Sequence, residues 1–149
     1  MKRKLTYLTG ALLAALLTAL YPRPDHIPET KSETITRSPE SLSVERARTK
    51  HLSGVWVEDH GNVVKRLADD ERGHRHQRFI LRLADGKTVL VVHNIDIAPR
   101  LPNLRRGESV AFRGEYLYNP KGGLIHWTHH DPSGRKKGGW LRYKGKLYR

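Results

Sequence analysis

The stretch HQRFILRLADGKTVLVVHNI (residues 76–95) contains two apolar runs separated by a short polar segment. Asp85-Gly86 in that segment is a strong hairpin signal, because Gly tolerates the positive φ that a tight turn requires. A two-residue turn there would bring four apolar side chains together in two cross-strand pairs: Phe79 with Val92, and Leu81 with Leu90. The opposite face would then carry His76, Arg78 and Arg82, with His93 nearby. The stretch therefore predicts a β-hairpin with one apolar face and one basic face.

A second hairpin signal lies downstream, where SVAFRGEYLY (109–118) and GLIHWTH (123–129) flank Asn119-Pro120-Lys121-Gly122. A turn centred on Pro120-Lys121 would pair Tyr116 with Ile125, and Gly114 with Trp127. The bare backbone of Gly114 would leave room for the indole ring. The opposite face would carry Arg113, Glu115, His126 and Thr128.

Further short runs complete an all-β pattern. GVWV (54–57) and GNVVKRL (61–67) form a first strand region, and WLRYKG (140–145) with KLYR (146–149) predicts a small terminal hairpin. Five main strands with Gly-bearing turns favour a small OB-like five-stranded barrel, and an open β-sandwich is the alternative. The expected core consists of Phe79, Leu81, Leu90, Val92, Phe112, Tyr116, Ile125 and Trp127.

The N-terminal segment has the pattern of an export signal. Lys2-Arg3-Lys4 precedes an uncharged apolar run from Leu5 to Leu20, which is typical of a secretory signal or of an uncleaved anchor. Residues 1–21 are therefore predicted to be a signal peptide or signal anchor. Residues 22–53, rich in Pro, Ser, Thr and charge, are predicted to be a flexible linker, and residues 54–149 the β domain.

Composition restricts the chemistry and the partners. The 149 residues contain 28 Lys and Arg against 15 Asp and Glu, a formal net charge of +13, and no Cys. Disulfides, thiolate nucleophiles and Cys-based zinc sites are therefore excluded. The positive charge favours a polyanion partner, DNA or RNA foremost, with an anionic membrane surface as a competing interpretation. Basic and aromatic residues alternate in the last stretch, where Trp140, Tyr143 and Tyr148 are candidates for stacking on bases.

Three kinds of site fit the polar residues. Anion binding would use Arg78, Arg100, Arg113, Lys121 and Arg135. A divalent metal such as Zn²⁺ would be held by His76, His93 and His126, since neutral imidazole is a normal zinc ligand. Hydrolysis of a phosphodiester, as in a nuclease, would use His93, Glu115, His126 and His129. The purely structural interpretation is that Glu115 and His126 form a cross-strand pair and that His129 and Asp131 cap a turn.

Long motifs carry a resemblance. HQRFILRL, HNIDIAPR and GEYLYNPKGGLIHWTHHDPSGR with a following GGW, within residues 54–149, resemble a family of small exported bacterial proteins of unknown function. The resemblance implies an exported single-domain protein, and it brings no established activity. The N-terminal segment predicts that this protein is periplasmic, or anchored to the inner membrane facing the periplasm. The polar residues that match the family pattern are His76, Gln77, His93, Asn94, Asp96, Arg100, Glu115, Asn119, Lys121, His126, Thr128, His129 and Asp131.

The sequence thus leaves three functions open. The favoured one is an exported basic barrel that binds polyanions, most of all nucleic acid, through a face rich in His, Arg and Glu. The first alternative is a metal-dependent or His-based hydrolase of phosphodiesters. The second is a periplasmic metal-binding or envelope-associated protein without catalysis.

Overall fold

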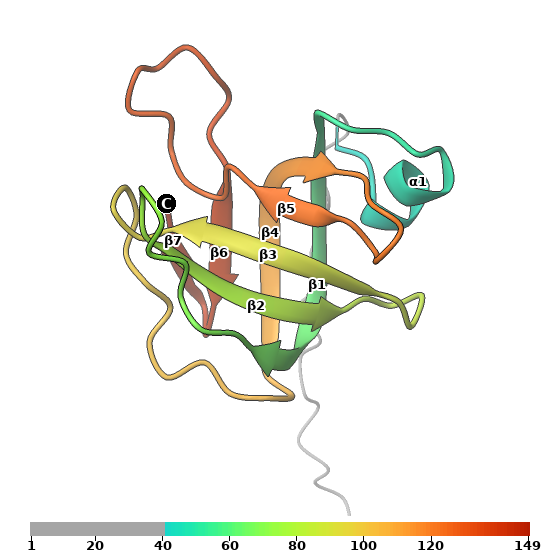
Figure 1. Cartoon of the computed structure of the whole chain (residues 1–149), viewed down its shortest axis with the longest axis horizontal. Helices are drawn as coiled ribbons and strands as arrows, with labels where there is room; N and C mark the ends of the chain where they lie inside the picture. The colour runs from blue at the N-terminus through green and yellow to red at the C-terminus, as the bar shows by residue number, and fades with distance from the viewer. Residues whose placement is uncertain (1–40) are drawn as a thin grey trace, which may run out of the picture. The chain divides into compact units, whose positions relative to one another are not determined.

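Alternating apolar residues build a barrel in the part of the chain that the computed structural model describes, residues 41–149 (Figure 1). Its strands are β1 (Val55–Arg66), β2 (His76–Arg82), β3 (Thr88–Asn94), β4 (Ser109–Leu117) and β5 (Leu124–His126). They follow the order β1-β2-β3-β5-β4, and β4 also pairs with β1, which closes the barrel. β3 and β5 are parallel, and the other pairs within the barrel are antiparallel. The predicted OB-like five-stranded barrel is confirmed.

The last two strands complete one wall of the barrel. β5 is short, and residues 127–139 leave the sheet as a long loop after it. β6 (Trp140–Tyr143) then pairs with β4 where β5 no longer covers its edge, and β7 (Lys146–Tyr148) pairs with β6. The predicted terminal hairpin is therefore present. Its aromatic residues are not all available for stacking on bases, because Tyr143 and Tyr148 are buried in the core.

A short helix covers the barrel end at which β2 turns into β3. The helix is α1 (Val44–Thr49), and the Ser43 hydroxyl caps it by accepting a hydrogen bond from the Arg46 N–H. Val44 and Ala47 are fully buried and belong to the same core as the strands. The packed region therefore begins before residue 54, where the sequence placed the end of the linker.

The connector between β3 and β4, residues 95–108, closes the opposite end of the barrel without a regular helix or strand. Leu101 and Leu104 insert into the core and are each 1% exposed. The buried amide of Gln77 exchanges two hydrogen bonds with the Leu101 backbone, donating to its carbonyl at 3.0 Å and accepting from its N–H at 2.9 Å. An inward-facing side chain thus satisfies backbone groups that no regular element would pair.

The β2–β3 hairpin differs from prediction by one residue in register. Its turn has three residues rather than two, since the Leu83 N–H donates to the Lys87 carbonyl and Gly86 has a φ of +76°. Phe79 therefore pairs with Val91, and Leu81 with Val89. The prediction that Leu90 and Val92 lie in the core is wrong, because both point outward and are only partly buried. The outward placement of His93 is wrong for the same reason: its side chain is inside and 0% exposed.

The β4–β5 hairpin has the predicted register, with Tyr116 opposite Ile125. The strand pairing ends at the next residue, however, because Trp127 has a φ of +51° and turns its side chain away from the core. Thr128, predicted to face outward, is instead fully buried beside Gly114, where a Cβ would lie 3.0 Å from its methyl carbon. The prediction that Trp127 is a core residue is therefore wrong.

The predicted signal or anchor segment (1–21) and residues 22–40 of the predicted linker lie outside the described residues. Within residues 41–149, no helix is both long enough and apolar enough to cross a membrane.

Because Ile125 is buried and Trp127 lies at the surface, truncation to Ala is expected to lower the free energy of unfolding by different amounts at the two positions. Ile125 is 0% exposed, so Ile125→Ala is expected to lower the free energy of unfolding by about 2–5 kcal/mol. Trp127→Ala removes a larger but only partly buried side chain, so it is expected to lower the free energy of unfolding clearly less. Urea denaturation of both variants measures the difference. A larger loss for Trp127→Ala than for Ile125→Ala would contradict the outward position of the indole.

Candidate functional site

A pocket of about 290 Å³ lies where β2 begins and β3 and β5 end. It is named here the histidine pocket and is lined by His74, His76, Val92, Asn94, Ile97, His126, Trp127 and His129. Strand alternation explains part of this lining, since His76, Val92 and His126 all point away from the core. The positive φ of Trp127 then brings the indole to the same side. Three of the predicted site residues, His76, His126 and His129, are thus brought together.

Trp127 contacts two polar side chains of its own loop. Its ring is tilted against that of His129, with the centroids 5.1 Å apart, and the Lys136 Nζ lies 4.5 Å from its centroid. The Nδ1 of His129 is 2.6 Å from the His130 carbonyl, which holds the imidazole in place. Burial lowers the pKa of His129, so this ring is neutral at pH 7.

His126 and Glu115 face each other across the β4–β5 pair, as predicted. The His126 Nε2 lies 3.3 Å from the Glu115 Oε2. This nitrogen is nevertheless buried without a hydrogen bond to any of the described residues. Burial lowers the pKa of His126, and the neighbouring Glu115 carboxylate opposes that shift. The side chain as a whole is 34% exposed and lines the pocket, so this neutral ring can accept a proton or hydrogen-bond a ligand there.

His93 lies behind the pocket, inside the barrel. Its Nε2 is 3.1 Å from the Pro99 carbonyl, and its Nδ1 is 2.8 Å from the Thr128 Oγ1. A carbonyl can only accept, so Nε2 carries the hydrogen and the Thr128 hydroxyl donates to Nδ1. Burial lowers the pKa of His93 to about 4. The buried imidazole therefore joins β3 to the connector and to the loop after β5.

The predicted metal ligands are only partly assembled. His76 and His126 line the histidine pocket, but His93 does not, and both of its ring nitrogens already have partners in the protein. Among residues 41–149, no three His, Asp or Glu side chains are arranged to hold a metal ion. A divalent metal at this pocket stays a prediction. The imidazoles of His76 and His126 would be its ligands there.

The predicted anion-binding residues lie on different parts of the barrel. Arg78 points outward from β2, whereas Lys121 lies in the β4–β5 turn at the other end of the barrel. Arg113 is on the outer side of β4, with its guanidinium carbon 5.7 Å from the centroid of a Trp56 ring. The other two are held by neighbours: Arg100 pairs with Asp69, and Arg135 donates to Ser133.

Asp131, which matched the resembled family, has a local structural role. Its carboxylate accepts hydrogen bonds from the backbone N–H groups of Lys136 and Ser133, at 2.7 and 3.0 Å. These hydrogen bonds lower the pKa of Asp131 to about 2, and the bond from the Lys136 N–H contributes most. Asp131 thus shapes the loop that carries Trp127, as the purely structural interpretation expected.

The outer surface of β2 and β3, next to the histidine pocket, was only half predicted. Arg78 and Arg82 alternate there with Ile80, and β3 contributes Leu90 and Val92. This β2–β3 face is defined by those five residues, and within the described chain no carboxylate occupies its outward strand positions. The sequence predicted the two arginines. It missed the apolar residues between them, because the two-residue turn placed Leu90 and Val92 inside.

These features define a class of protein: a small basic OB-like barrel with a histidine- and tryptophan-lined pocket at one end of its β2–β3 face. The chain belongs to the family described as protein of unknown function (DUF3465), which matches residues 31–149. The resemblance to a family of unknown function is thereby confirmed. No curated protein matches the chain.

The buried neutral His93 predicts that stability depends on pH. An unfolded His titrates near 6.5, whereas folded His93 titrates at about 4. Between these values the unfolded chain binds a proton that the folded chain excludes, so the free energy of unfolding falls as the pH drops from 6.5 towards 4. The expected loss from this residue is about 3 kcal/mol.

Denaturant titrations at pH 7 and pH 4 measure this loss. His93→Gln is the matched variant, because its amide nitrogen can still donate to the Pro99 carbonyl but does not titrate. Its stability is expected to change less between the two pH values than that of the wild type. An equal change in both proteins would contradict the assignment to His93.

Proposed function

We propose that this protein binds single-stranded nucleic acid, with its β2–β3 face contacting the backbone and its histidine pocket accepting a base. The observation that carries the proposal is the composition of that face, beside an outward-turned Trp127: its outward strand positions hold two arginines and three aliphatic residues, and the carboxylate paired with Arg78, that of Asp70, lies 3.9 Å away outside β2. OB-fold barrels bind oligonucleotides on the corresponding strands. Single-strand binding in general combines a positive groove with an aromatic ring on which a base can stack.

The two kinds of polar residue have separate roles in this proposal. Arg78 and Arg82 stay charged at every physiological pH and provide the attraction to phosphate. His126 and His129 are neutral at pH 7, because burial lowers their pKa values, so they add hydrogen-bonding groups but no charge. Such groups suit the edges of a base better than a phosphate.

Removal of the two arginines tests the proposal. Fluorescence anisotropy of a labelled single-stranded oligonucleotide would be measured over a range of salt concentrations. Arg78→Ala/Arg82→Ala is expected to weaken binding and to reduce the slope of log K against log salt by about 1.4, since each phosphate contact to a single strand contributes about 0.7.

A matched control separates the face from the overall charge. Arg105→Ala/Arg106→Ala removes the same charge from exposed positions in the β3–β4 connector and is expected to leave the slope nearly unchanged. Equal effects of the two double variants would show that binding is not localised on the β2–β3 face. Salt-insensitive or undetectable binding by the wild type would refute the proposal.

Phosphodiester hydrolysis is a second candidate, which the Glu115–His126 pair favours. His126 would take a proton from the attacking water while the carboxylate orients the ring. The test is cleavage of a labelled strand with added divalent ions and with a chelator. His126→Gln is expected to slow cleavage by about 100-fold or more, and His130→Gln, at an exposed position in the loop that follows β5, to leave it unchanged. Absence of cleavage by the wild type in every condition would exclude this candidate.

Export of the protein is part of the proposal. It is supported by Lys2-Arg3-Lys4 and by the apolar run from Leu5 to Leu20. We infer that the barrel acts in the periplasm, as a free domain or attached to the inner membrane by that segment.

A further inference from the structure

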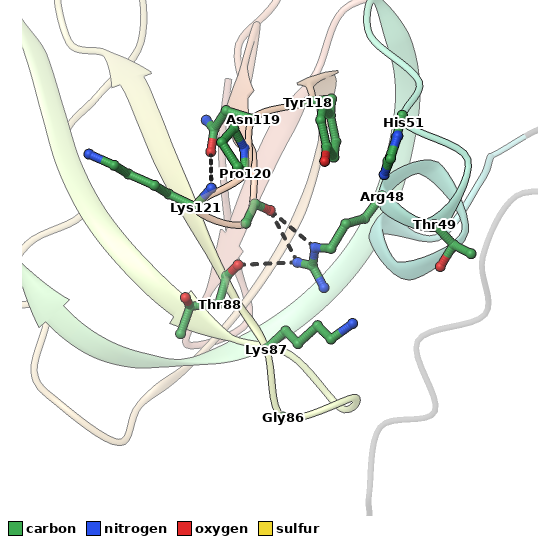
Figure 2. A pocket seen from close by; sticks show the side chains of 11 residues that line it. Arg48, Thr49, His51, Gly86, Lys87, Thr88, Tyr118, Asn119, Pro120 and Lys121 are labelled. Atoms are coloured by element: carbon green, nitrogen blue, oxygen red, sulfur yellow. Dashed lines mark hydrogen bonds between the residues drawn. The ribbon is translucent and has the colours of Figure 1, made fainter.

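A larger pocket lies at the opposite end of the barrel from the histidine pocket (Figures 1 and 2). Its volume is about 600 Å³, within the range of small-molecule sites. It is enclosed by α1, the β2–β3 turn and the β4–β5 turn, and it is named here the basic pocket. Its lining is Arg48, Thr49, His51, Gly86, Lys87, Thr88, Tyr118, Asn119, Pro120, Lys121 and Gly122.

Arg48 is the fixed part of this pocket. Its guanidinium donates to the carbonyls of Thr88 and Gly122, at 3.1 and 3.2 Å, and it forms an ion pair of 2.8 Å with Asp85. Figure 2 shows the bonds from Arg48 to the two turns. A single buried side chain therefore holds both turns against α1. Because Asp85 balances the charge of Arg48, the excess charge of the pocket comes from other residues.

Lys87 and Lys121 supply that excess. Both are exposed, one in each turn, and neither forms an ion pair with a described residue. No carboxylate belongs to the lining within the described chain. The two lysines thus add a charge of +2, which matches the charge of −1.5 to −2 on a phosphomonoester at pH 7.

The wall beside the cations is aromatic. His51 and Tyr118 are tilted against each other, with their ring centroids 4.3 Å apart. His51 follows the C-cap of α1 with a φ of +51°, at the position that Gly normally takes in this type of helix end. The residue there is nevertheless a histidine, and its imidazole lies against the ring of Tyr118. The pair provides a flat surface next to the positive charge.

We propose that the basic pocket binds the nucleoside monophosphate group, with the phosphate at Lys87 and Lys121 and the base against the His51–Tyr118 pair. The group has two sources: a free nucleotide, or the 5′-phosphorylated end of a strand. The proposal does not rest on binding at the β2–β3 face, because none of the five residues of that face lines the basic pocket.

Calorimetric titration of the full-length protein with adenosine 5′-monophosphate and with adenosine tests the phosphate contact. The nucleotide is expected to bind at least about tenfold more tightly than the nucleoside. Lys87→Ala/Lys121→Ala is expected to remove this difference, and Lys87→Arg/Lys121→Arg to keep it. The control Lys146→Ala/Arg149→Ala removes the same charge from exposed positions outside the pocket and is expected to bind as the wild type does.

A further variant tests the aromatic wall. Tyr118→Leu keeps an apolar side chain but removes the ring, so it is expected to weaken binding of the nucleotide without changing that of inorganic phosphate. Equal binding of nucleotide and nucleoside by the wild type would overturn the proposal, and so would unchanged nucleotide binding by Lys87→Ala/Lys121→Ala.

Two oligonucleotides distinguish the sources of the ligand. A strand with a 5′-phosphate is compared with the same strand carrying a 5′-hydroxyl, in wild type, Lys87→Ala/Lys121→Ala and Arg78→Ala/Arg82→Ala. If the 5′-phosphate strengthens binding of the strand, and only Lys87→Ala/Lys121→Ala loses that increase in affinity, the ligand is the strand end. If the phosphate strengthens binding of the free nucleotide alone, the ligand is the free nucleotide. No phosphate-dependent gain with any ligand overturns the proposal, whereas the salt dependence at Arg78 and Arg82 tests the β2–β3 face separately.

Discussion

The fold depends on how the β3–β4 connector is sealed against the barrel. Residues 95–108 form no helix or strand, so their backbone groups need partners at a buried end of the core. Gln77 and His93, neighbours on β2 and β3, supply them through bonds to Leu101 and Pro99. Both side chains must therefore point inward. That requirement agrees with the three-residue β2–β3 turn and excludes the register that would turn His93 to solvent.

The buried hydrogen bonds of His93 also determine which side chains line the histidine pocket. His93 also bonds Thr128, which must be buried to reach it. The chain reverses its facing between His126 and Thr128 through the positive φ of Trp127, and the indole is left on the outside. Trp127, a large aromatic residue expected in the core, thus becomes part of a surface pocket. The reason is that the buried hydrogen bond to His93 brings Thr128, and not Trp127, into the core.

The sequence was sufficient for the barrel and for one hairpin. Alternation over 109–118 and 123–126 determined the pairing of Tyr116 with Ile125, because a shift of one residue would place polar side chains opposite these apolar ones. It was not sufficient for the β2–β3 register, since Leu90-Val91-Val92 offers apolar side chains to either face and only the turn length separates the two solutions. The outward position of Trp127 could not be predicted either, for another reason: a positive φ at a bulky residue leaves no mark in the alternation of apolar and polar residues.

The two ends of the barrel differ in the polar side chains that line their pockets. The histidine pocket is lined by imidazoles, two of which burial keeps neutral, whereas the basic pocket has Lys87, Lys121 and a neutralised Arg48. Between the ends, Arg78 and Arg82 alternate with aliphatic residues on the outer face of β2. A polyanion attracted by the net charge of +13 would bind anywhere on a uniformly basic surface. The described residues instead place their charges at separate sites that differ in burial and in their neighbours, so the net charge alone does not determine where on the barrel an anion is held.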